Sequence, residues 1–229
     1  MSAQSEFTAD PVGFMENHVV VCNFPMPWEP GGINQRESRP HVITIEEIAE
    51  STVVNLKNAK AFQFTANTTG RSLADKLVIY WLGFQPKVAT GGTVDGRSNY
   101  VFTAVMSGCT LGIGSQTGDG SCTLYHANAI GSEPPKQRAD QRVQLDTAFN
   151  GADYSRVSPL DYRSDRGGSL DYLATNFGVR DGGRWNFYTH KYLKMNHANR
   201  GEYYGGKFIH GGIEEARTIS TMIGYRGRS

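Results

Sequence analysis

Alternation of apolar and polar positions predicts that strands form most of this chain. In residues 61–67, Phe62 and Phe64 are separated by a polar position, which is typical of a strand with one buried face. Residues 41–45 are rich in β-branched side chains, which fit the pleated surface of a sheet. The same signals predict strands at 19–24, 41–45, 61–67, 100–106, 110–113, 121–130, 142–149, 170–177, 185–195 and 218–225.

Two segments carry helical signals. Apolar residues at three- and four-residue intervals give residues 69–84 one apolar stripe, made of Leu73, Leu77, Tyr80 and Trp81. Thr44 stands in N-cap position before two glutamates, which predicts a helix over 45–60. A single helical turn is expected at 213–217.

Glycine and proline mark the segments without regular structure. The many turn formers in residues 1–40 predict an extended N-terminal wrap over the domain, apart from the strand at 19–24. Residues 87–99 read as a glycine-rich loop. The short, regularly spaced strands favour an α/β (α+β) fold, a β-sandwich of mixed, mostly antiparallel sheets flanked by helices. We expect residues 1–229 to form a single domain.

Composition narrows the classes of function. Lys and Arg total 23 against 22 Asp and Glu, so the chain lacks the strong field that recruits nucleic acid or membrane surfaces. It has no apolar run of membrane-spanning length and no N-terminal pattern of a classical secretory signal. Three cysteines, an odd and low number, favour a reducing compartment over a disulfide framework. A bridge between Cys109 and Cys122 would remove the one thiol that suggests a chemistry.

That thiol ends the sequence Met106-Ser107-Gly108-Cys109. Thr103 lies six residues before Cys109, and His126 lies seventeen after it. On one straight strand Thr103 and Cys109 would be ~20 Å apart, too far for one histidine to contact both. Ser107-Gly108 is a turn dipeptide, and a hairpin there would bring them within roughly 10 Å. The catalytic interpretation therefore predicts a hairpin between 100–106 and 110–113.

In that arrangement His126 would accept the thiol proton of Cys109, and Thr103 would orient the imidazole. Gly108 would leave backbone N–H groups open for an oxyanion hole. The structural alternative is that Cys109 is a small buried hydrophobe and Thr103 a strand former. Cys122 shares strand parity with His126 but has no glycine turn beside it, so we interpret it as core packing.

The motif, with a threonine six residues before the cysteine and a histidine on the next strand, resembles the catalytic region of the cytotoxic necrotizing factor and Burkholderia lethal factor group. The usual motif of that group is Leu-Ser-Gly-Cys, and Met106 replaces the leucine here. The same residue order is similar to that of bacterial chemotaxis receptor deamidases. The resemblance covers about thirty residues, from Tyr100 to Ile130. It implies a Cys109 nucleophile, a His126 base and Thr103 as third member, with Ser107 and Gly108 at the turn.

The resemblance also implies a function. The chain would be a bacterial toxin or effector that converts one glutamine of a host protein to glutamate. The favoured substrate is the RNA helicase of translation initiation, with a Rho GTPase second. The protein would be a monomer without cofactor or metal, made in the bacterial cytoplasm and active in the host cytosol after secretion. The alternatives are a cysteine peptidase or transglutaminase with the same triad, and a non-enzymatic β-sandwich binding module.

Three other features of the sequence suggest a site or a role in substrate binding. His190 and His197 offer too few ligands for a metal centre. The glycines between Gly112 and Gly120 are not followed by a lysine-bearing helix, so they predict a hairpin turn and not a phosphate loop. Residues 90–96 are expected to form a flexible rim around a narrow glutamine pocket.

Overall fold

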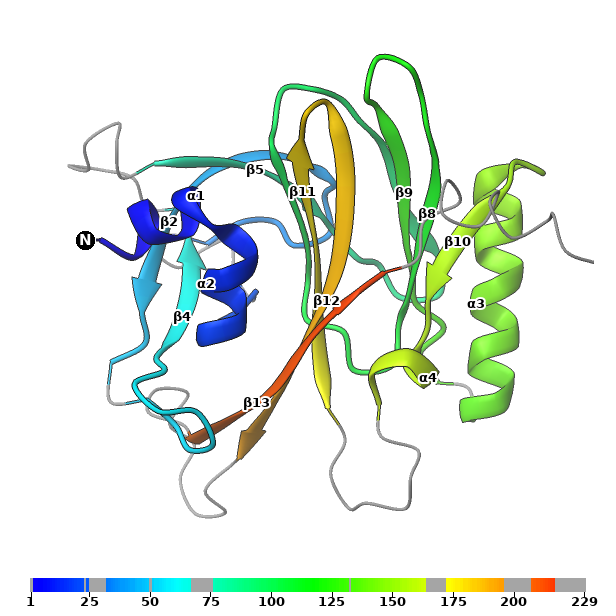
Figure 1. Cartoon of the computed structure of the whole chain (residues 1–229). Coiled ribbons are helices and arrows are strands. Elements are labelled where there is room, and N and C mark those ends of the chain that lie inside the picture. Colours follow the sequence, from blue (N-terminus) through cyan, green and yellow to red (C-terminus); the bar gives the residue numbers. More distant parts are fainter. Residues whose placement is uncertain are drawn as a thin grey trace, which may run out of the picture.

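Two packed β-sheets with helices on their outer faces form the molecule (Figure 1). The computed structural model describes residues 2–22, 24, 32–49, 51–66, 76–131, 133–163, 172–195 and 207–216. One sheet has nine strands and the other four. The predicted fold class, a mixed and mostly β fold with a few flanking helices, is confirmed.

The described helices are α1 (Ala3–Ala9), α2 (Pro11–Asn17), α3 (Pro134–Phe149) and α4 (Pro159–Tyr162). The nine-stranded sheet contains, in spatial order, β1 (Val19–Val21), β4 (Ala61–Thr65), β2 (Arg39–Glu47), β5 (Leu77–Leu82), β7 (Tyr100–Thr103), β11 (Leu173–Asp181), β12 (Arg184–Met195), β13 (Lys207–Glu215) and β3 (Thr52–Val53). The four-stranded sheet contains β10 (Tyr154–Val157), β8 (Thr110–Gln116), β9 (Cys122–Ala127) and β6 (Ala89–Val94).

The large sheet is mixed and the small one is antiparallel. Parallel pairing joins β1 to β4, β5 to β7 and β13 to β3, whereas the other neighbours are antiparallel. The parallel neighbours β5 and β7 are joined by a crossover that includes β6 of the other sheet. The chain therefore passes between the sheets on both sides of β7, which places β7 beside the small sheet.

Helices α1 and α2 cover one face of the large sheet. Phe7 of α1 contacts the rings of Tyr100 and Phe102, with centroid separations of 5.2 and 6.0 Å. Phe14 of α2 lies 5.0 Å from the ring of Phe62. The predicted extended wrap over residues 1–40 is therefore wrong in this part. The side chain of Asp10 accepts the Gly13 N–H and caps α2, and a proline at the first helical position is a standard helix start.

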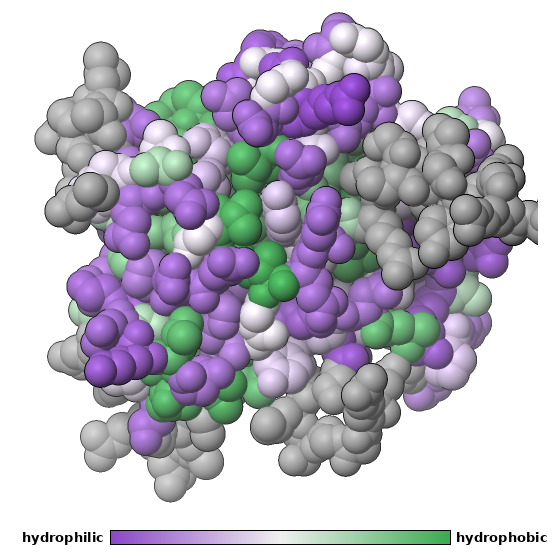
Figure 2. All heavy atoms as spheres, viewed as in Figure 1, coloured by the Kyte–Doolittle hydropathy of each residue, from purple (hydrophilic) through white to green (hydrophobic). Residues whose placement is uncertain are grey.

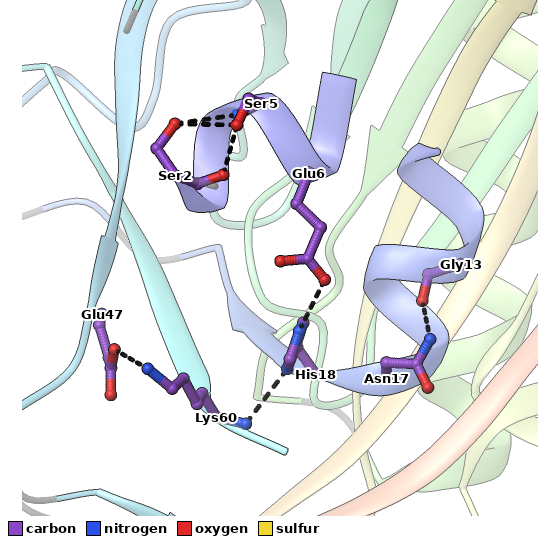
Figure 3. Close-up of polar contacts among 8 residues, drawn as sticks. All are labelled: Ser2, Ser5, Glu6, Gly13, Asn17, His18, Glu47 and Lys60. Carbon is purple, nitrogen blue, oxygen red and sulfur yellow. Dashed lines mark hydrogen bonds and ion pairs between the residues drawn. The ribbon is translucent and has the colours of Figure 1, made fainter. Parts of the chain in front are cut away.

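His18 ties these helices to the sheet (Figure 3). Its Nε2 lies 3.3 Å from a carboxylate oxygen of Glu6 in α1, and its Nδ1 accepts the backbone N–H of Lys60 at 3.2 Å. The Lys60 ammonium in turn pairs with Glu47 at the end of β2, at 2.7 Å. One imidazole thus connects α1 to the strand segment that enters β4.

Alternate residues of the small sheet face two different layers. Leu111 and Ile113 of β8 point into the core between the sheets, whereas Gly112 and Gly114 lie under α3. A Cβ atom on Gly112 would lie 2.7 Å from the Phe149 ring, closer than atoms pack. These glycines therefore allow α3 to lie close against β8. The predicted hairpin turn is confirmed for Gly118 and Gly120, which lie between the antiparallel strands β8 and β9, but is wrong for Gly112 and Gly114, which belong to β8.

The inter-sheet core is the layer between the two sheets. The large sheet contributes apolar residues from β5, β7, β11 and β12, and the small sheet contributes them from β6, β8, β9 and β10. Its buried members are Leu82, Val94, Val101, Met106, Cys109, Leu111, Ile113, Cys122, Leu124, Val157, Tyr162, Ala174, Trp185, Phe187 and Ala216. On the outside, the face in Figure 2 is mainly hydrophilic, with an interrupted hydrophobic band through its middle.

Both predicted long helices are wrong. Residues 77–82 form β5, a central strand that buries Leu77, Ile79 and Trp81 on one face and carries the exposed but apolar Val78 on the other. Residues 67–75 lie outside the described residues. Because both faces of such a strand are apolar, its pattern includes three- and four-residue intervals that mimic a helix. In the segment 45–60, Glu46 and Glu47 pair with β4 and extend β2, and β3 follows.

Other predictions fail for similar reasons of context. The predicted strand 142–149 is the second half of α3, whose Leu145 and Phe149 face the small sheet one helical turn apart. The predicted loop 87–99 contains β6, and the predicted turn 213–217 includes the end of β13. The predicted strand 218–225 lies outside the described residues. The remaining predicted strands overlap observed ones.

Gly91 and Gly92 are adjacent in β6 and give a matched test of this packing. A Cβ on Gly91 would lie 1.9 Å from the Leu124 carbonyl oxygen, whereas one on Gly92 would meet nothing closer than the Tyr80 hydroxyl at 3.9 Å. We expect Gly91→Ala to lower the free energy of unfolding by about 2 kcal/mol or more. Gly92→Ala should stay within about 1 kcal/mol of wild type. Urea denaturation measures both, and equal effects would contradict the β6–β9 register.

Candidate functional site

The Met106–Cys109 motif lies where the chain passes from the large sheet to the small one. Strand β7 pairs with β5 and β11, and β8 pairs with β9 and β10, so the predicted hairpin between β7 and β8 is wrong. Met106 instead forms an isolated bridge with Ala174 of β11, with N–H···O distances of 2.7 and 2.9 Å. The chain bends at Ser107 and Gly108 immediately after this bridge and then enters β8.

Packing of the sheets nevertheless places the three predicted residues in one layer. Thr103 shares its strand face with Val101 of the inter-sheet core, and His126 shares its face with Leu124. Cys109 is itself a member of that core. Leu82 links two of them, because it pairs in register with Thr103 and its backbone lies beside the His126 imidazole.

His126 is fully buried, and neither ring nitrogen makes a hydrogen bond of normal geometry with the described residues, although the Leu82 backbone lies close enough to favour the protonated ring. Its nearest aromatic neighbour is Phe84, with ring centroids 6.0 Å apart. No hydrogen bond joins its ring to the Cys109 sulfur. The structure thus brings the imidazole and the thiol into the same layer without a hydrogen bond between them.

Burial controls the protonation of both groups. It raises the pKa of the Cys109 thiol to about 12, because the thiolate would lose its hydration. It lowers the pKa of His126 to about 4, an effect that the nearby Leu82 backbone only partly opposes. At neutral pH the site therefore holds a thiol and a neutral imidazole. Both shifts disfavour transfer of the thiol proton to the imidazole in the resting protein.

Thr103 is fixed by the large sheet. Its hydroxyl oxygen accepts the backbone N–H of Asn176 at 3.1 Å, which leaves its own hydrogen available for donation. The Asn176 side chain is held in turn by the hydroxyl of Thr189, at 2.6 Å. Asn176 and Thr189 belong to the surroundings of the site, but their polar side chains carry no distinguishing motif in the sequence.

Side chains from α3 and α4 hold the backbone around Cys109. Gln141 donates its amide N–H to the Gly108 carbonyl at 2.6 Å and accepts the Thr110 hydroxyl at 2.7 Å. The hydroxyl of Tyr162 donates to the Cys109 carbonyl at 2.8 Å. Neither residue was predicted. Gln141 could have been found from its four-residue spacing to Leu145, once 134–149 is recognised as a helix.

The other cysteines do not compete for the role of nucleophile. All three thiols are free. Cys122 donates to the Gly114 carbonyl at 3.4 Å, and burial raises its pKa to about 12. It lies four residues from His126 on the same strand, which is roughly 13 Å at the usual rise. This separation supports the interpretation of Cys122 as core packing.

The other residues that the sequence suggested for a binding or metal site lie in strands or outside the described residues. Thr90 pairs directly with His126, so the predicted flexible rim at 90–96 is largely a strand beside the site. His190 is fully buried in β12, and His197 lies outside the described residues. Within the described ranges, no group of three His, Cys, Asp or Glu side chains could hold a metal ion. None of the described helices is long and apolar enough to cross a membrane.

Comparison of the sequence with protein-family models and with curated proteins gives no match. The resemblance to the deamidase toxins therefore rests on the motif residues and their spacing alone.

The buried imidazole makes stability depend on pH. The folded-state pKa of His126, about 4, lies below the usual 6.5, so the unfolded chain binds a proton that the folded chain excludes. The stability that depends on a neutral His126 is fully present above pH 6.5. As the pH falls from 6.5 toward 4, this stability is lost, and the free energy of unfolding decreases by about 1.4 kcal/mol per pH unit. We expect His126→Asn to reduce the slope of unfolding free energy against pH by that amount in urea titrations. A variant with the wild-type slope would show that His126 titrates normally.

Proposed function

We propose that this protein is a cysteine-dependent hydrolase of the glutamine deamidase kind, acting on a side-chain carboxamide of another protein. The observation that carries the proposal is that the buried His126 imidazole, which makes no hydrogen bond of normal geometry, lies in the same layer as the Cys109 thiol and the Thr103 hydroxyl. An unpaired buried polar group costs about 1–3 kcal/mol. Because buried polar groups are nearly always hydrogen-bonded, the burial of this imidazole needs an explanation, and a catalytic role provides one.

The reaction proceeds in two steps. The Cys109 sulfur attacks the carboxamide carbon while its proton passes to His126, and the imidazolium then protonates the departing nitrogen, which leaves as ammonia. Water, deprotonated by His126, hydrolyses the thioester to a carboxylate and restores the thiol. Because the free thiol is neutral, proton transfer accompanies attack, and substrate binding has to close the distance between sulfur and imidazole. Thr103 orients the ring.

The substrate follows from the resemblance. A host protein is the acceptor, with the RNA helicase of translation initiation favoured over a Rho GTPase. In this proposal the chain is a bacterial toxin or effector that acts in the host cytosol after secretion. The new carboxylate adds a negative charge where an uncharged amide stood, which is enough to disable a catalytic or switch glutamine.

A second candidate is a non-enzymatic β-sandwich binding module. The burial that raises the pKa of Cys109 to about 12 favours it, since an inert buried thiol has that property. A peptidase or transglutaminase would use the same three residues as the deamidase. These candidates differ in their products.

Incubation with eukaryotic lysate followed by mass spectrometry separates them. We expect wild-type protein to convert a specific glutamine to glutamate with release of ammonia, and Cys109→Ser to lose this activity while folding normally. Cys122→Ser serves as the control and should retain activity. Amine adducts would indicate a transglutaminase and chain cleavage a peptidase. Full activity in Cys109→Ser, or no product from wild type, would contradict the proposal.

Thiol alkylation tests the protonation state directly. With a pKa of about 12, Cys109 in the free protein should react slowly with iodoacetamide at neutral pH. Its rate should rise about tenfold per pH unit without a plateau near neutrality, because thiolate is the reactive form. Peptide mass spectrometry reports the alkylation of each cysteine. A plateau at low pH would reveal a thiolate already present in the free protein.

A further inference from the structure

The backbone of the motif is held at two successive carbonyls by buried side chains from outside its sheet. Gln141 of α3 is fully buried and bonds the Gly108 carbonyl. Tyr162, at the end of α4, is 2% exposed and bonds the Cys109 carbonyl. These carbonyls belong to the peptide groups immediately before and after the Cys109 Cα.

The orientation of the Gln141 amide is determined by its two partners. The amide nitrogen donates to Gly108, and the amide oxygen accepts the hydroxyl of Thr110, the residue after the cysteine. Gln141 therefore bonds both to the residue before Cys109 and to the residue after it. An apolar side chain of the same length would fill the space but make neither bond.

Anchoring both peptide planes limits rotation on either side of Cys109 and so directs its side chain. Because a trans peptide is planar, the Cys109 N–H points opposite to the Gly108 carbonyl, and hence away from Gln141. The side of Gly108 where a Cβ would stand is lined by Gln137 and Arg163, with atoms 3.5 to 4.0 Å from that position. A Cβ there would be in ordinary van der Waals contact with both side chains, so Gln137 and Arg163 border this side of the turn.

We propose that Gln141 and Tyr162 are positioning residues that hold the Cys109 peptide so that its sulfur and its N–H face the same reacting carboxamide. In this arrangement the N–H is the oxyanion donor, and the two side chains act through the backbone without contacting substrate. The inference rests on the proposed function. Its structural basis, the fixed turn, can be tested independently of deamidation.

Gln141→Met and Tyr162→Phe remove the two contacts, and the chain offers matched controls for both. Gln144, on the same helix, donates at 3.3 Å to the carbonyl of Asn128, the residue after β9, and not to a carbonyl of the motif. The Tyr154 hydroxyl donates to Asp146 at 2.6 Å at the far end of β10. Gln144→Met and Tyr154→Phe therefore make equivalent chemical changes without removing a bond to the peptide groups of Cys109.

We expect Gln141→Met and Tyr162→Phe each to lower kcat for deamidation by about 10- to 100-fold with KM nearly unchanged, because misplacing a reacting group by about 1 Å has effects of that size. The control variants should keep wild-type kcat. We also expect the alkylation rate of Cys109 to rise several-fold in the two site variants, because a loosened turn exposes a thiol that is now 9% exposed. The rate for Cys122 should not change.

The two readouts separate failure of the inference from failure of the proposed function. If the wild type deamidates nothing, the proposed function fails, and a change of Cys109 alkylation in the site variants alone still supports the fixed turn. Site variants that match their controls in both kcat and alkylation overturn the inference. If a urea titration shows that Gln141→Met is unfolded, Thr110→Val takes its place as the site variant. It removes the hydrogen bond between Thr110 and Gln141 with a smaller loss of packing.

Discussion

The packing of the nine-stranded sheet against the four-stranded sheet is the interaction on which the rest of the structure depends. Large apolar side chains from both sheets fill the layer between them, and each contributes roughly 2 kcal/mol on burial. The same packing places β7 beside the small sheet, although the two share no strand pairing. Thr103, Cys109 and His126 occupy one layer because of that contact. A weaker contact between the sheets would separate them, whatever their spacing in the sequence.

This location has chemical consequences. A layer that excludes water keeps both the thiol and the imidazole neutral, so the resting site is not a reactive ion pair. Exclusion of water also strengthens every polar interaction that a bound carboxamide would make. In the proposed deamidase, such a site would be unreactive in the free protein and would need its substrate to bring sulfur and base together. Holding the Cys109 backbone from α3 and α4 fits this requirement, because it fixes the sulfur while the base is still out of contact.

Small residues let the layers approach closely. Gly112 lies under Phe149 of α3, and Gly91 lies against the backbone of β9, at distances that leave no room for a side chain. In the sequence these glycines read as loop and turn signals, and only the neighbouring elements give them another meaning. The predicted loop at 87–99 was wrong for this reason, since β6 pairs with β9 through a glycine-rich segment.

The sequence by itself determined the strand-rich class and most strand positions, because alternation and β-branched composition are local properties. It also predicted that Thr103, Cys109 and His126 lie near one another, and they share one layer, although the hairpin that was to bring them together does not form. Only the tertiary structure decided that β7 and β8 belong to different sheets, since strand partners depend on contacts between distant segments such as Met106 and Ala174. It also decided that 77–82 is a strand, because the less buried face carries apolar residues such as Val78, which hides the alternation in the sequence. The protonation of Cys109 was likewise beyond the sequence, because desolvation depends on what surrounds a thiol.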